Sequence, residues 1–342
     1  MLYPIVFQPV FKERIWGGRE LERLYAKSLP TGKPIGESWE ISDRPGDASI
    51  IANGTLAGKT LRWLMENHVA EILGDAKPAA EGHFPLLCKI LDAREKLSLQ
   101  VHPKPGSAGV SPAGSETRRR DGSAPGDEPK TEMWFIADAA PDANLYVGLK
   151  RGVTRADFEK RISDGSVADC IYRIPVHAGD AMFLPSGRVH AIGAGLVIFE
   201  IQQNSDTTYR VFDWNRAGLD GKPRELQVAQ SLASIDFNDF EPKLVETKPT
   251  HIAGSIYKWR KLVQDPLFNV HEMTVETSEF ILMRGGTMRI IAVVKGVVTV
   301  TSDGCESPVE LLPGQFGLLP ASLISPELET KPNTTYLCVE AN

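Results

Sequence analysis

Residues Gly179–His190 read G-D-A-M-F-L-P-S-G-R-V-H and decide how the surrounding chain is expected to fold. Alternating apolar side chains, among them Ala181 and Phe183, predict a short buried strand. The P-S-G segment at 185–187 predicts a turn, because proline fixes φ and glycine accepts positive φ. His190 then opens the apolar run A-I-G-A-G-L-V-I-F-E-I. This order predicts two strands joined by a tight turn, with a histidine placed to face the mouth of a barrel.

The spacing G-x5-P-x-G-x2-H of this stretch resembles the second metal-binding motif of the cupin superfamily. A single histidine is more often a hydrogen-bonded core or turn residue than a metal ligand. Here the four fixed residues of the motif favour the metal ligand. Gly314–Ser325 reads G-Q-F-G-L-L-P-A-S-L-I-S, which repeats the glycine and the proline but has Ser322 and Ser325 in place of the second glycine and the histidine. We interpret it as an internal repeat without a ligand; the alternative is chance, since a Gly-x5-Pro pair is common.

The composition favours a mainly β protein. The 342 residues are 42% hydrophobic and include 30 Gly and 24 Pro, which together with many short apolar runs indicate strands separated by turns. We predict two cupin-like β-barrels (jelly rolls) with a few helices inserted in and after the first. Residues 1–240 are expected to form a metal-binding catalytic domain with a flexible, low-complexity loop at 105–130. Residues 241–342 are expected to form a second, degenerate barrel without a metal site.

Charge and targeting signals limit the kinds of partner. A net charge of −6 without a basic stripe argues against nucleic acid. The N-terminus lacks the features of a signal peptide, and no apolar run is long enough to span a bilayer. Four scattered cysteines without a C-x-x-C pair suit a reducing compartment. A cytoplasmic protein with no nucleic-acid or membrane partner is expected, as a monomer or weak homodimer.

Several local elements are predicted from pattern. Apolar spacing indicates a helix over 61–73, capped by Thr60 and ended by Gly74. Further helices are predicted over 154–164 and 225–235. Two apolar runs flanking residues 92–96 predict a hairpin.

Four residues have side chains suited to a shared metal ion. Gln100 and His102 are two residues apart and therefore share one face of a predicted strand. Glu132 begins another strand, and His190 follows the glycine–proline turn. Histidine with oxygen ligands is a donor set that zinc accepts. The spacing alone does not decide between one shared metal site and four polar residues that are scattered by chance.

Four segments, in this order along the chain, make a resemblance specific: S-L-Q-V-H-P, K-T-E-M-W, the glycine–proline turn and N-S-D-T-T-Y-R-V-F-D-W. Together they resemble type I mannose-6-phosphate isomerase (phosphomannose isomerase) in its short bacterial form, through most of residues 3–240. The resemblance implies one Zn²⁺ per chain, with Gln100, His102, Glu132 and His190 as ligands. The low-complexity insertion before Glu132 departs from the family pattern.

The resemblance also implies an activity and further site residues. The activity is interconversion of mannose 6-phosphate and fructose 6-phosphate by proton transfer between C1 and C2 through an enediol(ate). The implied catalytic residues are Lys89, Lys130, Asp206 and Arg210, and Ser98 is expected to join Lys89, Lys130 and Arg210 in binding the sugar phosphate. The base stays open among Lys89, Asp206 and His102, with His102 last because a metal-bound imidazole is a poor base.

Two other functions remain alternatives: a cupin oxygenase with Fe(II), and a non-catalytic cupin that binds a sugar or a metal. An amide ligand and nearby cationic side chains favour an anionic sugar over dioxygen chemistry. Each residue also has an ordinary interpretation. Lys89 and Lys130 would be solvated charges at strand edges, and Asp206 with Arg210 a surface ion pair.

Overall fold

The computed structural model describes residues 2–105, 128–251, 257–302 and 307–342. It is mainly β, with 42% strand and 14% helix, as the composition predicted. The flexible loop expected at 105–130 lies almost entirely outside the described residues.

In chain order the elements are β1 (Ile5–Gln8), β2 (Val10–Gly18), α1 (Glu20–Tyr25), β3 (Ile35–Ile41), β4 (Ile50–Ile51), α2 (Leu61–Leu73), β5 (Leu86–Ala93), β6 (Leu99–Val101), β7 (Glu132–Ala139), β8 (Asn144–Leu149), α3 (Arg155–Asp164), β9 (Ile171–Pro175), β10 (Ala181–Leu184), β11 (His190–Ile192), β12 (Leu196–Gln203), β13 (Tyr209–Phe212), α4 (Val228–Ser234), β14 (Thr250–His251), β15 (Tyr257–Gln264), β16 (Phe268–Val275), β17 (Glu279–Leu282), β18 (Arg289–Lys295), β19 (Val298–Thr301), β20 (Val309–Leu311), β21 (Phe316–Leu319), β22 (Glu327–Thr330) and β23 (Thr334–Ala341), with short 3₁₀ turns at Ala80–Gly82 and Val167–Cys170.

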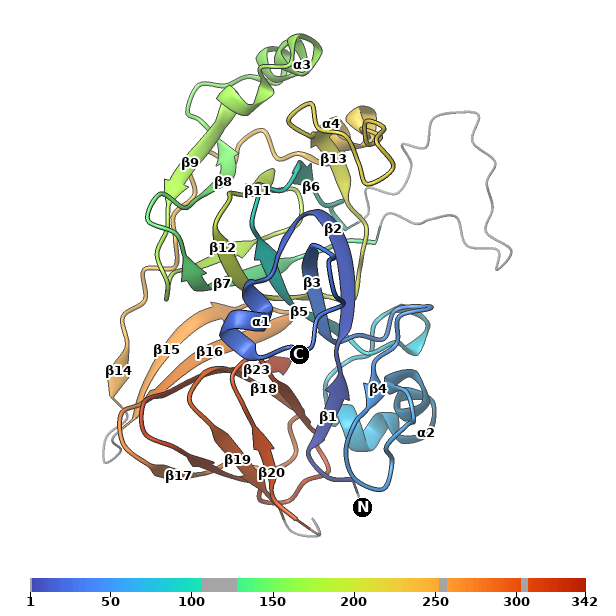
Figure 1. Ribbon diagram of the computed structural model, residues 1–342, viewed down its shortest axis with the longest axis vertical. Helices are drawn as coiled ribbons and strands as arrows, with labels where there is room; N and C mark the ends of the chain where they lie inside the picture. The colour runs from blue at the N-terminus through green and yellow to red at the C-terminus, as the bar shows by residue number, and fades with distance from the viewer. Residues whose placement is uncertain (1, 106–127, 252–256, 303–306) are drawn as a thin grey trace. The chain divides into compact units, whose positions relative to one another are not determined.

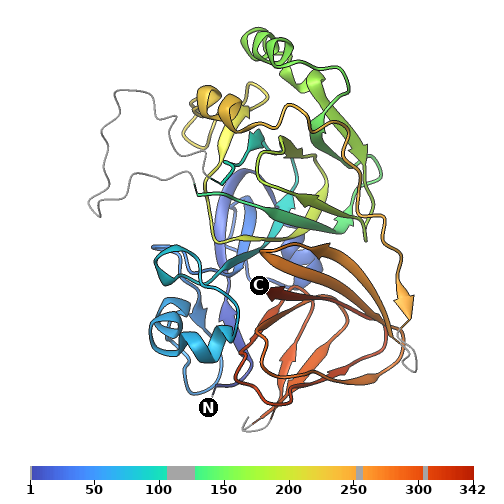
Figure 2. The same cartoon turned by 180° about the vertical axis from the view of Figure 1, so that it is seen from behind.

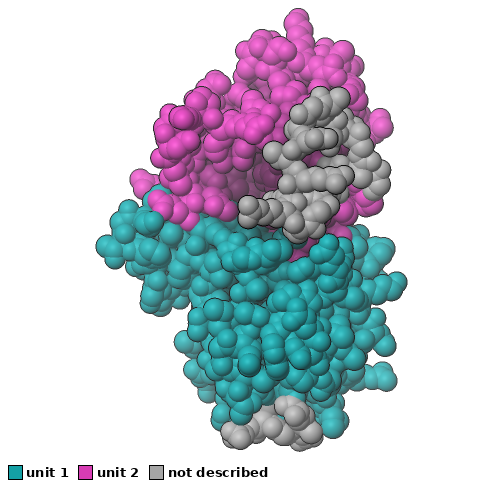
Figure 3. All heavy atoms as spheres, turned by 90° about the vertical axis from the view of Figure 1, so that its right-hand side faces the viewer, with its two compact units in different colours: residues 1–12, 19–90, 245–342 teal, residues 13–18, 91–244 magenta. Residues whose placement is uncertain are grey.

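The chain divides into two compact units (Figure 3). Unit 1 contains residues 1–12, 19–90 and 245–342, and unit 2 contains residues 13–18 and 91–244. The N-terminal segments therefore group with the C-terminal strands, which differs from a boundary at residue 240. The division into a catalytic domain and a degenerate domain without metal stays a prediction.

Unit 1 is a sandwich of two antiparallel sheets, whose C-terminal strands Figure 2 shows from behind in orange and red. One sheet has the order β14-β15-β16-β23-β18-β21-β1-β4, and the other has the order β17-β22-β19-β20. The sheets pack through an apolar cluster to which both contribute, including Ile291, Tyr336, Val300 and Leu328. Alternation is clear in β19 and β22, where Val300 and Leu328 are buried between partly exposed polar neighbours.

Unit 2 repeats this arrangement with helices added. Its five-stranded sheet has the order β13-β6-β11-β8-β9, and the adjacent strands β10-β7-β12 form its second layer. Trp134, Met182 and Ile198 from the second layer pack against Leu145 and Val147 of the first. The outer face of the five-stranded sheet is covered by α3 and α4, whose apolar residues join a separate cluster (Figure 1). The inner faces of the two layers enclose the space in which polar side chains gather.

The predicted helices are present, with one boundary shifted. The Thr60 side chain accepts a hydrogen bond from Trp63 N at 3.1 Å, and Gly74 ends α2, as expected. Thr154 forms a capping box with Asp157 at the start of α3. The third helix, α4, begins at Val228 rather than at 225. None of the helices in the described ranges has the length and apolar character needed to cross a bilayer.

The predicted hairpin around residues 92–96 is wrong. β6 pairs with β11 and β13, whereas β5 belongs to a different sheet. The segment between them therefore carries the chain from one layer to the other. Two apolar runs around a polar break are compatible with either connection, and only long-range pairing decides between them.

The stretch Gly179–His190 forms the expected strand, turn and strand. β10 is followed by a turn in which Arg188 N donates to Pro185 O at 3.1 Å. Gly187 has φ of +91° and its N–H donates to His102 O at 3.0 Å. A β-carbon at Gly187 would overlap Cε of Lys104 and lie 3.0 Å from Ser234 O. The positive φ therefore favours glycine here, and a β-carbon would in addition be tight against Ser234 O.

Replacing Gly187 by alanine is expected to lower the free energy of unfolding by more than the same change at Gly179. Both glycines have φ near +90°, but a β-carbon at Gly179 meets no atom within 4 Å. Gly179→Ala therefore reports the backbone strain alone, roughly 1–3 kcal/mol, and Gly187→Ala adds the overlap. Urea unfolding of both variants measures the difference, and equal losses would contradict the close packing at Gly187.

Candidate metal site

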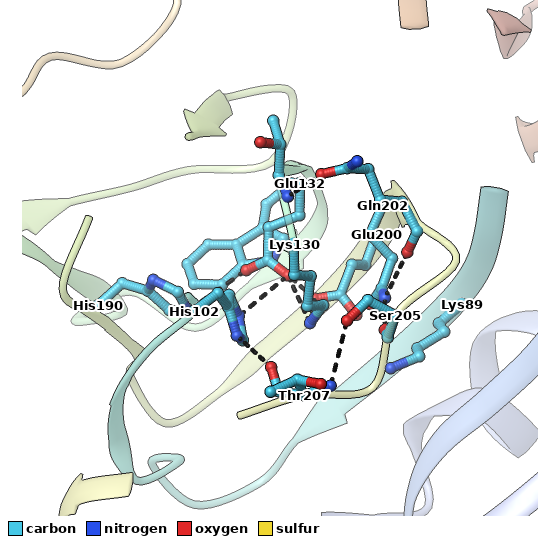
Figure 4. Close-up of polar contacts among 12 residues, drawn as sticks. Lys89, His102, Lys130, Glu132, His190, Glu200, Gln202, Ser205 and Thr207 are labelled. Atoms are coloured by element: carbon cyan, nitrogen blue, oxygen red, sulfur yellow. Dashed lines mark hydrogen bonds and ion pairs between the residues drawn. The ribbon is translucent and has the colours of Figure 1, made fainter. Parts of the chain in front are cut away.

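Three buried side chains from separate strands converge between the layers of unit 2. His102 follows β6, Glu132 begins β7 and His190 begins β11, and their ligand atoms all lie within 4.8 Å of one another. His102 Nε2 is 3.5 Å from Glu132 Oε2, and His190 Nε2 is 3.3 Å from Glu132 Oε1. Each residue is at most 2% exposed. Figure 4 shows the group with its neighbours.

Strand register explains this convergence. His190 lies directly opposite Gln100 in the β11–β6 pair, and Glu132 lies opposite Leu184 and Gln202 in its two pairs. Directly opposed residues of antiparallel strands point to the same face. Successive side chains of a strand point to opposite faces. Leu99 is next to Gln100 and Ala191 is next to His190, and both pack on the helix-covered side, so Gln100 and His190 face inward.

Backbone carbonyls fix the tautomer of both imidazoles. His102 Nδ1 lies 2.9 Å from Thr207 O, and His190 Nδ1 lies 2.9 Å from Arg188 O. A carbonyl oxygen only accepts, so each Nδ1 carries the proton and each Nε2 presents a lone pair. Burial lowers the pKa of His190 to about 3, and burial with nearby Lys130 also lowers the pKa of His102, which keeps both rings neutral.

These residues fit a divalent metal ion. Within the described part of the chain, the Nε2 atoms of both histidines and Oε1 of Glu132 are buried without a hydrogen-bond partner. Neutral imidazoles held through Nδ1 by a carbonyl, together with a carboxylate, form a donor set used by metalloproteins. A cation between them would satisfy atoms that the protein leaves unsatisfied.

Lys130 supplies the nearest positive charge. Its Nζ is 2.6 Å from Glu132 Oε2 and 4.0 Å from Glu200 Oε1. Burial opposes the charge, but the two carboxylates outweigh burial and raise the pKa of Lys130 above its usual value. Burial likewise opposes ionisation of Glu132, yet Lys130 holds the pKa of that carboxyl well below its usual range. Glu200 also accepts a hydrogen bond from Trp134 Nε1 at 3.0 Å.

Strand register relates Arg210 to Gln100, and its place in the site stays a prediction. Arg210 lies opposite Gln100 in the β13–β6 pair, so its side chain shares the inner face with Gln100 and His190. Its Nη1 donates to Glu225 O at 2.8 Å, while its Nε is buried without a hydrogen bond among the described residues. Burial and the neighbouring Arg224 lower the pKa of Arg210.

The other predicted site residues lie in different surroundings. Asp206 is exposed, and its charge acts on Lys130. Ser98 is 5% exposed, just before β6. Lys89 belongs to unit 1, where its Nζ lies 3.9 Å from Glu37 Oε2 and 4.8 Å from the centre of the Trp39 ring. Grouping Lys89 with the residues of unit 2 stays a prediction.

Glu200 and Gln202 were missed by the sequence analysis. They face Trp134 and Glu132 across the β12–β7 pair and therefore point toward the candidate site. A signal existed in L-V-I-F-E-I-Q-Q, where polar residues two apart interrupt an apolar strand. Polar groups on the inner face of a buried strand require partners, which is a reason to suspect a site.

Fold and site together define a cupin-type protein with two histidines and one carboxylate between its sheets. Residues 5–112 match the family described as phosphomannose isomerase type I, catalytic domain. The chain is 37% identical over 273 residues to the probable mannose-6-phosphate isomerase GmuF of Bacillus subtilis, covering 76% of this chain and 80% of that protein. It is 32% identical to the putative mannose-6-phosphate isomerase YvyI of Bacillus subtilis, covering 98% of each.

A solved structure agrees over the whole length. The crystal structure of mannose 6-phosphate isomerase from Bacillus subtilis superposes with a TM-score of 0.83 at 30% identity, covering 99% of each chain. The chain belongs to the type I mannose-6-phosphate isomerase (phosphomannose isomerase) family, and it is an isomerase of that class.

Lys130→Met is expected to destabilise the metal-free protein by about 3–5 kcal/mol, because it leaves buried carboxylates without their cation. Without Lys130 the pKa of Glu132 rises, so protonation relieves the loss as pH falls. The loss in the free energy of unfolding should therefore be larger at pH 8 than at pH 5. Urea unfolding in the presence of a chelator measures this. Lys104→Met, which removes an exposed ion pair with Asp236, should cost under about 1 kcal/mol at both pH values.

Proposed function

We propose that this chain interconverts mannose 6-phosphate and fructose 6-phosphate, with one Zn²⁺ held by Gln100, His102, Glu132 and His190. The observation that carries the proposal is the convergence of two Nε2 lone pairs and one carboxylate in a buried space. Two neutral histidines with oxygen donors suit zinc, and Gln100 shares their inward direction.

The reaction moves a proton between C1 and C2 and develops negative charge on the sugar oxygens. A bound Zn²⁺ would supply Lewis-acid stabilisation of that charge. Lys130 stays protonated because of its raised pKa, so it acts as a fixed cation and hydrogen-bond donor toward an oxygen anion. Arg210 presents a guanidinium suited to phosphate or to the enediolate oxygen through charge-assisted hydrogen bonds.

The proton transfer also needs a base with a pKa near the working pH. Lys130 is unsuited to this role because its pKa is raised. His102 is unsuited because its Nδ1 donates to Thr207 O and its Nε2 faces Glu132. Asp206 and Lys89 remain the proposed candidates.

Family membership favours the isomerase over the two alternatives. A pair of histidines with a carboxylate is also a common ligand set for Fe(II) oxygenases, so the ligands alone do not separate the two chemistries. Lys130 beside Glu132, together with the proposed role of Arg210, suits an anionic substrate, and the relatives covering most of the chain are named mannose-6-phosphate isomerases.

Purified protein is expected to contain about one zinc per chain and to form fructose 6-phosphate from mannose 6-phosphate in a coupled assay. Chelation should abolish the activity and added Zn²⁺ should restore it. Elemental analysis together with the assay tests this. A zinc-loaded protein without isomerase activity would contradict the proposal, and activation by iron alone would support the oxygenase.

Arg210→Ala is expected to lower kcat/KM by at least about 100-fold, because it removes a charge-assisted contact that strengthens in the transition state. Arg155→Ala is the matched control, since Arg155 forms an exposed ion pair with Glu159 on α3. Steady-state kinetics on both variants make the comparison. Equal effects would remove Arg210 from the proposed site.

A further inference from the structure

The orientation of His102 depends on a carbonyl in an irregular segment. Nδ1 of His102 bonds to Thr207 O at 2.9 Å, and Thr207 lies between β12 and β13 outside any strand. A carbonyl there has no strand ladder to hold it. Other contacts must keep this oxygen in place if it is to fix the tautomer of His102.

Ser205 provides the first of these contacts. Its Oγ accepts a hydrogen bond from Thr207 N at 3.2 Å and donates one to Glu128 O at 3.2 Å. The residue is 1% exposed. The hydroxyl therefore ties the backbone of Thr207, through its N–H, to the segment that leads into Lys130 and Glu132.

Gln202 provides the second contact. Its Nε2 donates to Ser205 O at 2.6 Å and to Gln203 O at 3.0 Å, which fixes the turn from within. Gln202 is fully buried and lies opposite Glu132 in the β12–β7 pair. Figure 4 shows the resulting series of hydrogen bonds from Gln202 through Ser205 and Thr207 to His102.

We propose that Ser205 and Gln202 are positioning residues that hold the Thr207 carbonyl on Nδ1 of His102 and thereby keep Nε2 available to a metal ion. This inference deepens the proposed function and rests on its metal site. The segment 202–207, at the end of β12 and just after it, would thereby orient His102, which is 105 residues before Thr207 in sequence.

Loss of the Ser205 hydroxyl has a defined consequence. The N–H of Thr207 loses its partner, so the backbone that carries the Thr207 carbonyl is held less firmly. The proton of His102 then gains access to Nε2, where it would point to Glu132 Oε2 at 3.5 Å. A protonated Nε2 does not bind metal. Outer contacts of this kind typically change metal affinity by about 10–100-fold.

The test uses full-length protein with ¹⁵N-labelled histidine, in metal-free form. Two-dimensional NMR of the imidazole nitrogens reports which nitrogen carries the proton, and the spectrum of His102→Gln identifies the signals of His102. Wild type should show the Nδ1–H tautomer. Ser205→Ala and Gln202→Met should each shift His102 toward Nε2–H and raise the zinc dissociation constant about tenfold or more.

Ser49→Ala is the matched control. Ser49 is also a fully buried serine whose Oγ accepts one backbone N–H, from Ser42 at 2.9 Å, but it lies in unit 1. It should lose stability without changing the tautomer or the zinc affinity. An unchanged His102 tautomer in either Ser205→Ala or Gln202→Met would overturn the inference. The tautomer is read without metal, so wild-type protein that fails to bind zinc would refute the proposed function and leave this test intact.

Discussion

The buried carboxylate of Glu132 is the constraint on which unit 2 depends. A charge fully removed from water is costly unless it is compensated. Lys130 compensates Glu132 directly at 2.6 Å but is shared with Glu200, while both imidazoles stay neutral because burial lowers their pKa values. Among the described residues, His102 Nε2, His190 Nε2 and Glu132 Oε1 are buried without a hydrogen-bond partner. These unsatisfied lone pairs around a buried carboxylate are the physical reason why a cation suits this place.

The fold concentrates these groups by bringing strand ends together. Glu132 begins β7 and pairs with Gln202 near the end of β12, while His190 begins β11 and pairs with Gln100 on β6. Antiparallel pairing places the start of one strand beside the end of its neighbour. The polar residues therefore gather at one end of the unit, and the rest of the space between the layers is filled by apolar side chains.

The sequence alone predicted the backbone of the site better than its contacts. Glycine and proline at 185–187 act locally, so the turn before His190 followed from a few neighbouring residues. The contact of Glu200 with Trp134 joins residues 66 apart, and it depends on the β12–β7 register. Thr207 holds His102 through a backbone carbonyl, which no residue type reveals. The supposed hairpin at 92–96 failed for the same reason, because local pattern does not encode which strands pair.

The proposed repeat in unit 1, Gly314–Ser325, can be compared with the stretch that precedes His190. Gly314 has φ of +78° and precedes β21, a four-residue strand like β10, which ends before Pro320 and a turn. At the position matching His190 stands Ser325, which is exposed, and the space between the sheets of unit 1 is lined by apolar residues. A β-carbon at Gly314 would collide with Tyr25, so this glycine is required for packing. A glycine and a proline flank the strand in both units, but the turns differ, because Gly187 has a positive φ and the matching Ser322 does not. The convergence of His102, Glu132 and His190 distinguishes the site of unit 2.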